Sequence, residues 1–283
     1  MQVNGMTKKI GLIGRPVGHS FSPRIHNGIS DRNQQNCIYV AHDVDPNDLE
    51  TAIKGLQALG YAGVNVTIPH KEAVLGLLDE VDDLAKWVGA VNTISFKQGR
   101  AIGTNTDVYG FTQMLDQAGV SLKDKRVAVL GTGGAAKAVI VACGVEGVQS
   151  LDLYSRKTET AASCLNKWSG EWQGIDRQPL NYRVWAEKAR DYDLVINCTP
   201  LGMHPHENRM PVEPNQVKAD CVLADIIYNP SETLFLRTGR ERGLKTVNGL
   251  DMLIFQAIKA YEIWTGVGAS SQKVRQEFMT EHM

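Results

Sequence analysis

The sequence predicts an α/β protein of two domains, each built on a mostly parallel sheet. At 283 residues, the chain is long enough for two ordinary domains. Short apolar, β-branched runs alternate with segments of helical periodicity, a pattern typical of parallel strands joined by helices. The alternation begins at Lys8 and starts again at Arg126. This restart indicates two successive α/β series rather than one sheet.

The first series provides five expected strands, which share apolar or β-branched residues. They lie at 8–14, 37–44, 62–68, 91–96 and 99–105. Helical patterns are expected at 22–32, at about 46–59 and from about 71 onward. The last two strands meet at Gln98-Gly99.

The second series provides five further strands and ends in a long amphipathic helix at 250–266. The strands are expected at 126–131, 151–156, 193–200, 221–228 and 245–249. The least patterned segment, 163–178, is expected to be rich in loops. No Pro- or Ser-rich linker marks a boundary, so we place the crossings near Asn105 and Asn248. The expected domains are therefore 1–104 with 248–283, and 105–247.

Composition excludes several classes of protein. Lys+Arg number 30 and Asp+Glu 31, a net charge of -1, so nucleic acid is not an expected partner. No apolar run reaches the length of about 18 residues that a membrane span needs, and the N-terminus does not resemble a signal peptide. The scattered cysteines form no CxxC pair and predict reduced thiols in a cytoplasmic protein. His204 and His206 flank Pro205 without a third ligand nearby, so no metal site is expected.

A glycine-rich turn directly follows the strand at 126–131 and opens a helix. Its sequence, Gly131-Thr132-Gly133-Gly134-Ala135-Ala136, is close to the GxGxxG pattern. Such glycines let the backbone approach a pyrophosphate, and the helix N-terminus offers free N–H donors. The candidate cofactor-binding residues are Gly131, Gly133, Gly134 and Ala135. The alternative is a turn that serves strand-to-helix packing alone.

The end of the next strand indicates which dinucleotide binds. An NAD site usually ends that strand with an acidic residue that accepts from the ribose 2′-OH. Here Ser155, Arg156, Lys157 and Thr158 occupy the position, and Asp152 comes too early. Two cations and two hydroxyls suit a 2′-phosphate, so NADP is favoured over NAD. The alternative is a solvated basic turn.

Polar residues also gather in the first half. Ser20 and Ser22 follow the first strand, and Ser22 before Pro23 would also suit a helix N-cap. Asn65 and Thr67 are two apart on a strand, so their side chains share a face at its carboxyl end.

Lys71 stands at an expected helix start, where a cation opposes the helix dipole. A lysine at this position is structurally unfavourable, which favours a functional role for Lys71. Asn92 and Asp107 add an amide and a carboxylate, although Thr106 or Asp107 would also suit a helix cap.

Together these residues resemble the shikimate dehydrogenase family. The resemblance rests on nine motifs in one order across almost the whole chain: GRPVGHSFSPRIHN, GVNVTIPHK, AVNT, GTNTDVYG, GTGGAA, SRKT, NCTPLGM, DIIYNP and NGLDMLIFQA. It implies an N-terminal α/β substrate domain and a Rossmann-type NADP-binding domain, with C-terminal helices that return to the substrate domain. It also implies reversible hydride transfer between NADPH and 3-dehydroshikimate, which gives shikimate.

The resemblance also implies residue roles. Lys71 and Asp107 match the family's catalytic pair. Substrate binding falls to Ser20, Ser22, Asn65, Thr67, Asn92, Tyr228 and Gln256. Beyond the glycine turn and the basic turn, the cofactor side falls to Thr199, Met203, Gly249 and Met252. Two departures are Thr132, where Ala is common, and Asp251, where Gly is frequent. Asp251 would weaken the binding of an acidic substrate only if it faced the cleft rather than solvent.

Three alternatives remain. A quinate/shikimate dehydrogenase would accept a broader range of substrates and cofactors. A methylene-tetrahydrofolate dehydrogenase would need an aromatic-lined pocket, which the sequence does not indicate. A non-catalytic NADP-binding sensor would be expected to lack one of the partners Lys71 and Asp107, yet both are present. The chain is expected to act as a monomer or homodimer.

Overall fold

The computed structural model describes residues 3–168 and 170–280. The chain divides into two compact units. Unit 1 comprises Met1–Gly110 and Ile254–Met283, and unit 2 comprises Phe111–Leu253. One boundary falls inside helix α5 (Thr106–Gln117) and the other inside helix α10 (Leu250–Thr265). Both lie a few residues beyond the crossings expected at Asn105 and Asn248.

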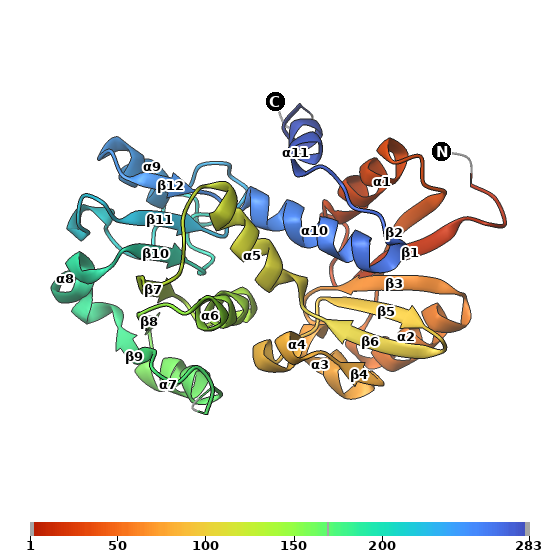
Figure 1. Ribbon diagram of the computed structural model, residues 1–283, viewed down its shortest axis with the longest axis horizontal. Coiled ribbons are helices and arrows are strands. Elements are labelled where there is room, and N and C mark those ends of the chain that lie inside the picture. The colour runs from red at the N-terminus through yellow and green to blue at the C-terminus, as the bar shows by residue number, and fades with distance from the viewer. Residues whose placement is uncertain (1–2, 169, 281–283) are drawn as a thin grey trace. The chain divides into compact units, whose positions relative to one another are not determined.

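Unit 1 holds a mixed six-stranded sheet in the order β2-β1-β3-β5-β6-β4 (Figure 1). The strands are β1 (Lys8–Gly14), β2 (Cys37–Asp43), β3 (Tyr61–Val66), β4 (Glu80–Val81), β5 (Thr93–Lys97) and β6 (Arg100–Thr104). β1 pairs parallel with β2 and β3, whereas β5 pairs antiparallel with β3 and β6. The β5–β6 turn gives Gln98 and Gly99 φ values of 52° and 76°, a conformation typical of tight hairpins.

Helices α1, α2 and α4 of unit 1 contact this sheet, and α11 contacts α1. The helices of the unit are α1 (Ser22–Arg32), α2 (Leu49–Ala58), α3 (His70–Ala73), α4 (Asp83–Val88), the first part of α5, the later part of α10, and α11 (Ser271–Thr280). The return of α10 is fixed by Trp264, whose Nε1 donates to the Ile94 carbonyl of β5 at 2.9 Å. A Cβ on Gly63 would lie 2.1 Å from that Nε1, so glycine is required there. The expected return of the C-terminal helices is confirmed.

Unit 2 holds a parallel six-stranded sheet in the order β12-β11-β10-β7-β8-β9 (Figure 1). The strands are β7 (Arg126–Leu130), β8 (Ser150–Ser155), β9 (Asp176–Asn181), β10 (Leu194–Asn197), β11 (Val222–Asp225) and β12 (Lys245–Val247). Numbered within the unit and read from β9, the order is 3-2-1-4-5-6, which is the Rossmann arrangement. The expected two-domain α/β fold is confirmed. The order reverses between β7 and β10, where such sheets bind ligands.

The helices of unit 2 are α6 (Gly134–Glu146), α7 (Thr158–Asn166), α8 (Trp185–Lys188), α9 (Leu234–Glu241) and the later part of α5. The expectation of a loop-rich segment at 163–178 is partly wrong, because α7 continues to Asn166 and β9 begins at Asp176. β9 is an edge strand with Pro179 inside it, and edge strands tolerate proline without apolar alternation. Its sequence therefore carried little strand signal.

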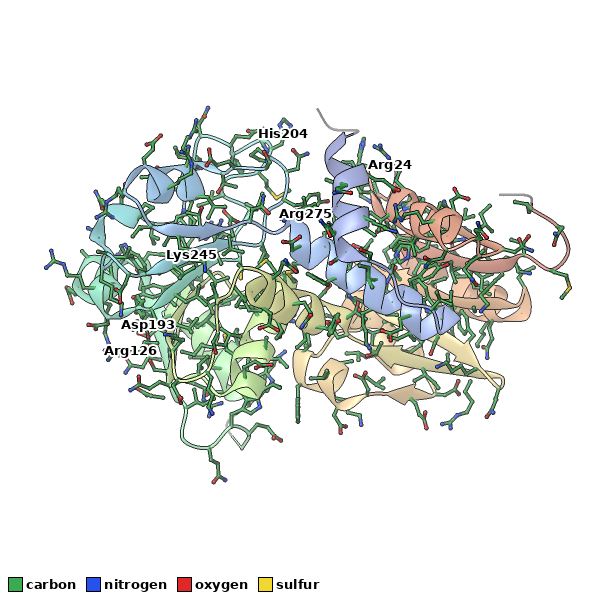
Figure 2. All side chains as sticks on the ribbon, turned by 45° about the horizontal axis from the view of Figure 1, so that its top comes forward. Arg24, Arg126, Asp193, His204, Lys245 and Arg275 are labelled. Carbon is green, nitrogen blue, oxygen red and sulfur yellow. The ribbon has the colours of Figure 1, made fainter. Side chains whose placement is uncertain are left out.

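Asp193, just before β10, joins a half-buried ion pair with Lys218 to a backbone hydrogen bond at the start of β7. It accepts from the Arg126 N–H at 2.8 Å (Figure 2) and from Lys218 Nζ at 2.5 Å. Burial acts to raise the pKa of Asp193, but the Arg126 N–H and the Lys218 ammonium outweigh it and hold the pKa below its ordinary value. No helix among the described residues is both long and apolar enough to cross a bilayer.

Candidate functional site

Lys71 and Asp107 form an ion pair in unit 1. Lys71 Nζ lies 2.7 Å from Asp107 Oδ2, and the two side chains are 27% and 13% exposed. Lys71 is the second residue of α3, and Asp107 is the second residue of α5. A charge-assisted hydrogen bond of this length is strong. The pair is therefore held firmly while both groups stay accessible to a ligand.

The helix caps leave these side chains available for other contacts. Asn105 Oδ1, rather than the side chain of Thr106 or Asp107, accepts from the Asp107 N–H at 3.0 Å. The capping alternative for Asp107 is therefore wrong. The α1 cap position is Phe21, and the Ser22 N–H donates to Ser20 Oγ at 3.2 Å. Ser22 is therefore not the N-cap, and the Ser20 hydroxyl accepts from the first N–H of the helix.

Asn92 connects Asp107 to the sheet. Its Nδ2 donates to Asp107 Oδ1 at 2.7 Å and to Thr106 Oγ1 at 3.0 Å. Its Oδ1 accepts from the Thr106 N–H at 2.8 Å. Asn92 is only 3% exposed. The amide on which the sequence places substrate binding is thus also the group that orients the carboxylate.

Asn65 lies deeper in the same network. Its Oδ1 accepts from Tyr39 Oη at 2.8 Å, and its Nδ2 donates to the Asn92 carbonyl at 3.1 Å and to Thr93 Oγ1 at 3.0 Å. Both amide protons are therefore engaged inside the protein. The amide oxygen Oδ1 can accept one more hydrogen bond, and the substrate contact expected from the sequence would use it.

Two other expected substrate residues lie in unit 1. Thr67 stands one residue past β3, and its γ-methyl would lie 2.3 Å from a Cβ on Gly14. Glycine at the end of β1 thus makes room for Thr67. Gln256 is half-buried on the part of α10 that belongs to unit 1.

Sequence reasoning missed Tyr39 and His26, which line the network. Burial raises the pKa of Tyr39, and the Ser22 hydroxyl opposes this to a smaller extent. The Tyr39 ring stacks on His26 with centroids 4.2 Å apart. Burial lowers the pKa of His26 to about 3, with the Asn65 amide acting weakly against it. Tyr39 therefore stands between Ser22 and Asn65, and its only sequence signal was one hydroxyl within a run of apolar residues.

The glycine turn of unit 2 combines two kinds of glycine. Gly131 has a φ of 103°, and its Cβ would lie 3.0 Å from Thr199 Cγ2, so the fold itself requires glycine there. A Cβ on Gly133 or Gly134 would meet no atom within 4 Å. Packing does not explain these two glycines, and the open space suits a close-lying pyrophosphate at the start of α6. Ala135 follows them, half-buried in the first turn.

The basic turn also fits a phosphorylated ribose. Ser155 ends β8 and is buried, whereas Arg156 and Lys157 are exposed. Asn181 Nδ2 donates to the Arg156 carbonyl at 2.9 Å and fixes the turn. Asp152 lies inside the strand and accepts from Tyr192 Oη at 2.7 Å, so it is engaged away from the turn. These residues fit NADP better than NAD.

A buried carboxylate organises the remaining cofactor loops. Asp225 is 0% exposed and accepts from Asn197 Nδ2 at 3.1 Å, Thr233 Oγ1 at 2.8 Å and the Ile227 N–H at 3.0 Å. Burial raises the pKa of Asp225 to about 6, although these three donors act to lower it. Asn197 Oδ1 in turn accepts from the N–H and the hydroxyl of Thr199 at 2.9 and 2.7 Å.

Asp225 therefore holds two loops, one with Thr199 and one with Tyr228. Met203 follows Thr199 in the first loop and is 41% exposed, while Tyr228 is half-buried. The Asn197 amide joins the two loops through Asp225, and none of the three groups that donate to the carboxylate carries a charge.

Three expected residues near the start of α10 also belong to unit 2. A Cβ on Gly249 would lie 2.0 Å from the Ile226 carbonyl, so this glycine is required by the backbone whether or not a cofactor lies nearby. Met252 is 8% and Asp251 9% exposed. The possibility that Asp251 points to solvent is therefore wrong. Among the described residues, no group of three or more His, Cys, Asp or Glu side chains is placed to hold a metal.

Comparison with known proteins decides the family. The model of the shikimate dehydrogenase substrate binding domain matches residues 12–94, and that of the shikimate 5'-dehydrogenase C-terminal domain matches residues 249–277. A shikimate dehydrogenase (NADP(+)) from Caldanaerobacter subterraneus subsp. tengcongensis is 43% identical over 266 residues, 94% of each chain. This chain belongs to the shikimate dehydrogenase family. The resemblance inferred from nine motifs is thereby confirmed.

Solved structures of the shikimate dehydrogenase family share this fold. Shikimate 5-dehydrogenase from Listeria monocytogenes, in complex with shikimate and NAD, has a TM-score of 0.93 at 28% identity and covers 98% of each chain. Shikimate 5-dehydrogenase from Thermus thermophilus, in complex with NADP(H) and shikimate, has a TM-score of 0.85 at 31% identity and covers 95% of this chain and 98% of its own. Relatives of this fold thus contain both dinucleotides.

Proposed function

We propose that this chain is an NADP-dependent shikimate dehydrogenase that reversibly reduces 3-dehydroshikimate to shikimate. The observation that carries the proposal is the Lys71–Asp107 pair, with Nζ and Oδ2 2.7 Å apart and both side chains partly exposed. Its curated relatives with the same NADP-linked activity match almost the full length of the chain.

Substrate recognition rests on many neutral hydrogen-bonding groups. Shikimate carries a carboxylate and three ring hydroxyls, so a site for it needs donors and acceptors at several positions. The residues proposed to supply them are Ser20, Ser22, Asn65, Thr67, Asn92, Tyr228 and Gln256. A site built to bind hydroxyls strongly rejects an analogue that lacks one, because its own polar groups are then left unpaired.

NADPH, when bound, supplies the hydride. Negative charge then grows on the carbonyl oxygen of the substrate, where the Lys71 ammonium stabilises it and delivers a proton. In the reverse direction a neutral Lys71 accepts the proton from the hydroxyl. Asp107 holds Nζ in place from 2.7 Å. Acid–base assistance of this kind contributes about 10²–10⁴-fold to the rate.

The cofactor is proposed to bind along the switch point of the unit 2 sheet. Gly133, Gly134 and Ala135 present backbone N–H groups to the pyrophosphate, with open space above the two glycines, and Gly131 shapes the turn that places them. Arg156 and Lys157, with Ser155, contact the 2′-phosphate. The nicotinamide half is assigned to Thr199, Met203, Gly249 and Met252. All five cysteines are free and buried, in keeping with the proposed cytoplasmic location, and the chain is proposed to act as a monomer or homodimer.

The test is an assay of nicotinamide reduction by the purified chain. Shikimate and quinate are each supplied with NADP⁺ and with NAD⁺, and the absorbance of the reduced nicotinamide is followed. Reduction mainly with shikimate plus NADP⁺ is the expected result. Comparable rates with quinate or NAD⁺ would establish the dual-specificity alternative instead. No reduction in any of the four, by protein shown to be folded, would favour the non-catalytic sensor.

A further inference from the structure

We propose that Thr93 is a positioning residue for the catalytic pair: its hydroxyl fixes the Asn92 amide in the orientation that donates to Asp107. The inference deepens the proposed function and rests on it. Thr93 is the first residue of β5 and is 0% exposed. Its hydroxyl contacts Asn92, Asn65 and Thr106, so its effect on Asp107 passes through Asn92.

The hydrogen bonds around Thr93 run from Asn65 toward Asn92. Asn65 Nδ2 donates to Thr93 Oγ1 at 3.0 Å, and the Thr93 hydroxyl donates to Asn92 Oδ1, also at 3.0 Å, whereas Thr106 Oγ1 is more distant at 3.3 Å. Asn92 Nδ2 then donates to Asp107 Oδ1 at 2.7 Å. At the other end, Tyr39 Oη donates to Asn65 Oδ1 at 2.8 Å. The chain of donors thus begins at a buried phenol and ends at the carboxylate that holds Lys71.

The direction matters because the two ends of an asparagine amide have nearly the same shape. A flipped Asn92 would turn its oxygen toward Asp107 Oδ1 and place two acceptors face to face. Three donors oppose that flip by pointing at Asn92 Oδ1, namely the Thr106 N–H at 2.8 Å, the Thr93 hydroxyl at 3.0 Å and the Thr106 hydroxyl at 3.2 Å. The Thr106 hydroxyl also accepts from Asn92 Nδ2 at 3.0 Å, so removing the closer Thr93 hydroxyl is the cleaner test.

The strand pairing explains why Thr93 is placed to do this. Thr93 lies opposite Asn65 on β3 and opposite Thr104 on β6. Its backbone is therefore held between two strands next to Asn92, and its side chain is fully buried there. A polar network that is fully satisfied in a buried site specifies one arrangement of its members.

The experiment compares Thr93→Val, which keeps the shape and removes the hydroxyl, with Thr93→Ser, which keeps the hydroxyl and removes the methyl. Kinetics are measured in the shikimate-to-NADP⁺ direction. Thr93→Val is expected to lower kcat by about 10- to 100-fold, the effect of a misplaced catalytic group. The KM for NADP⁺ is expected to stay unchanged, because the cofactor residues lie in unit 2. Thr93→Ser is expected to recover most of the lost turnover.

Two kinetic results would overturn the proposal. Thr93→Val with the kcat of the unmodified chain would show that the hydroxyl does not act. Equal losses in Thr93→Val and Thr93→Ser would show that packing of the methyl is what matters. If Thr93→Val does not fold, Thr93→Ala against Thr93→Ser gives the same comparison, since both lack the methyl and differ only in the hydroxyl.

A readout without turnover separates this proposal from the proposed function. The side-chain amide resonances of Asn92, assigned by their absence in Asn92→Asp, are followed by NMR. Thr93→Val is expected to shift them and speed their hydrogen exchange, whereas Thr93→Ser is expected to leave them nearly in place. Unmoved resonances in Thr93→Val would contradict the positioning role. A lack of turnover in the unmodified chain would instead count against the dehydrogenase assignment alone.

Discussion

Each unit of this protein places an asparagine amide against a carboxylate, but the two carboxylates differ in their other partners and in their exposure. In unit 1, Asp107 accepts from Asn92 and from the Lys71 ammonium, and its side chain is 13% exposed. In unit 2, Asp225 accepts from Asn197, Thr233 and a backbone N–H and is 0% exposed.

The difference shows how a carboxylate that accepts from an asparagine amide behaves with and without a cation beside it. Three neutral donors do not offset the burial of Asp225, so its pKa is raised to about 6 and a proton is held more readily. Asp107 has a positive partner within 2.7 Å and solvent at its edge. A carboxylate that accepts from an asparagine amide thus holds loops together in unit 2 and orients a reactive lysine in unit 1.

Removing the Lys71 ammonium is expected to have the largest effect, because it removes the main difference between Asp107 and Asp225. Lys71→Ala leaves Asp107 with neutral partners, as Asp225 has, and removes the proposed proton donor. We expect kcat to fall by about 10²–10⁴-fold, while the KM for NADP⁺ stays close to that of the unmodified chain. Steady-state kinetics with shikimate and NADP⁺ measure both constants. Near-normal turnover with only a shifted KM for shikimate would contradict the assignment of Lys71.

The raised pKa of Asp225 predicts a pH dependence of stability. The unfolded carboxyl titrates near 3.8 and the folded one near 6. Because the folded state holds the proton more tightly, its stabilising contribution is complete below about pH 4 and is lost as the pH rises through about 6. The difference corresponds to about 3 kcal/mol at most.

The measurement is urea unfolding between about pH 4 and pH 7 for the unmodified chain and for Asp225→Asn, whose amide does not titrate. We expect the difference in unfolding free energy between the two proteins to change across this range in favour of the variant at the higher pH. Other carboxyls, Asp193 among them, titrate in both proteins and so cancel. A difference that is independent of pH would show that Asp225 does not bind a proton more tightly in the folded state.

The exposed Arg156 of unit 2 is proposed to bind the 2′-phosphate of the cofactor, whereas Lys71 of unit 1 is proposed to act on the substrate. Replacing Arg156 tests the first of these roles. Arg156→Ala is expected to raise the KM for NADP⁺ by about 10-fold, the loss of one charge-assisted hydrogen bond, with little change in the KM for NAD⁺. Kinetics with the two cofactors at saturating shikimate give the comparison. Glu159→Ala, on the next helix α7, is a matched exposed control. An equal loss with NAD⁺ would mean that Arg156 does not contact the 2′-phosphate.

The sequence predicted most of the fold because apolar periodicity reports burial directly. It identified the strands at 8–14 and 126–131 and the helix at 22–32 with bounds close to those of β1, β7 and α1. It missed β4, which has only two residues, and β9, an edge strand that contains a proline. Such strands bury little, and their sequences therefore lack the pattern.

For the site, the sequence indicated residue types but not the direction of their hydrogen bonds. Lys71 and Asp107 were paired by the resemblance, and the structure places their charged atoms 2.7 Å apart. The roles of Thr93 and Tyr39 did not emerge, because one hydroxyl on an apolar strand has no distinctive spacing. Asn105 was likewise overlooked as the residue that accepts from the Asp107 N–H. The contacts that Tyr39 and Thr93 make with Asn65 join segments distant in the chain, and the sequence alone does not reveal them.

The smallest expected effect comes from the threonine beside the second carboxylate. Thr233 donates to Asp225 at 2.8 Å and also caps α9 through the Leu236 N–H. Thr233→Val is expected to reduce the unfolding free energy by about 1–2 kcal/mol, with Thr233→Ser as the control that keeps the hydroxyl.

The effect of Thr233→Val on kcat is expected to be smaller than that of Thr93→Val, since no reacting group depends on Asp225 for its orientation. Urea unfolding and steady-state kinetics on both variants measure the two effects. A loss of turnover without a loss of stability would mean that Asp225 serves the chemistry as Asp107 does, and that the contrast between the two carboxylates does not hold.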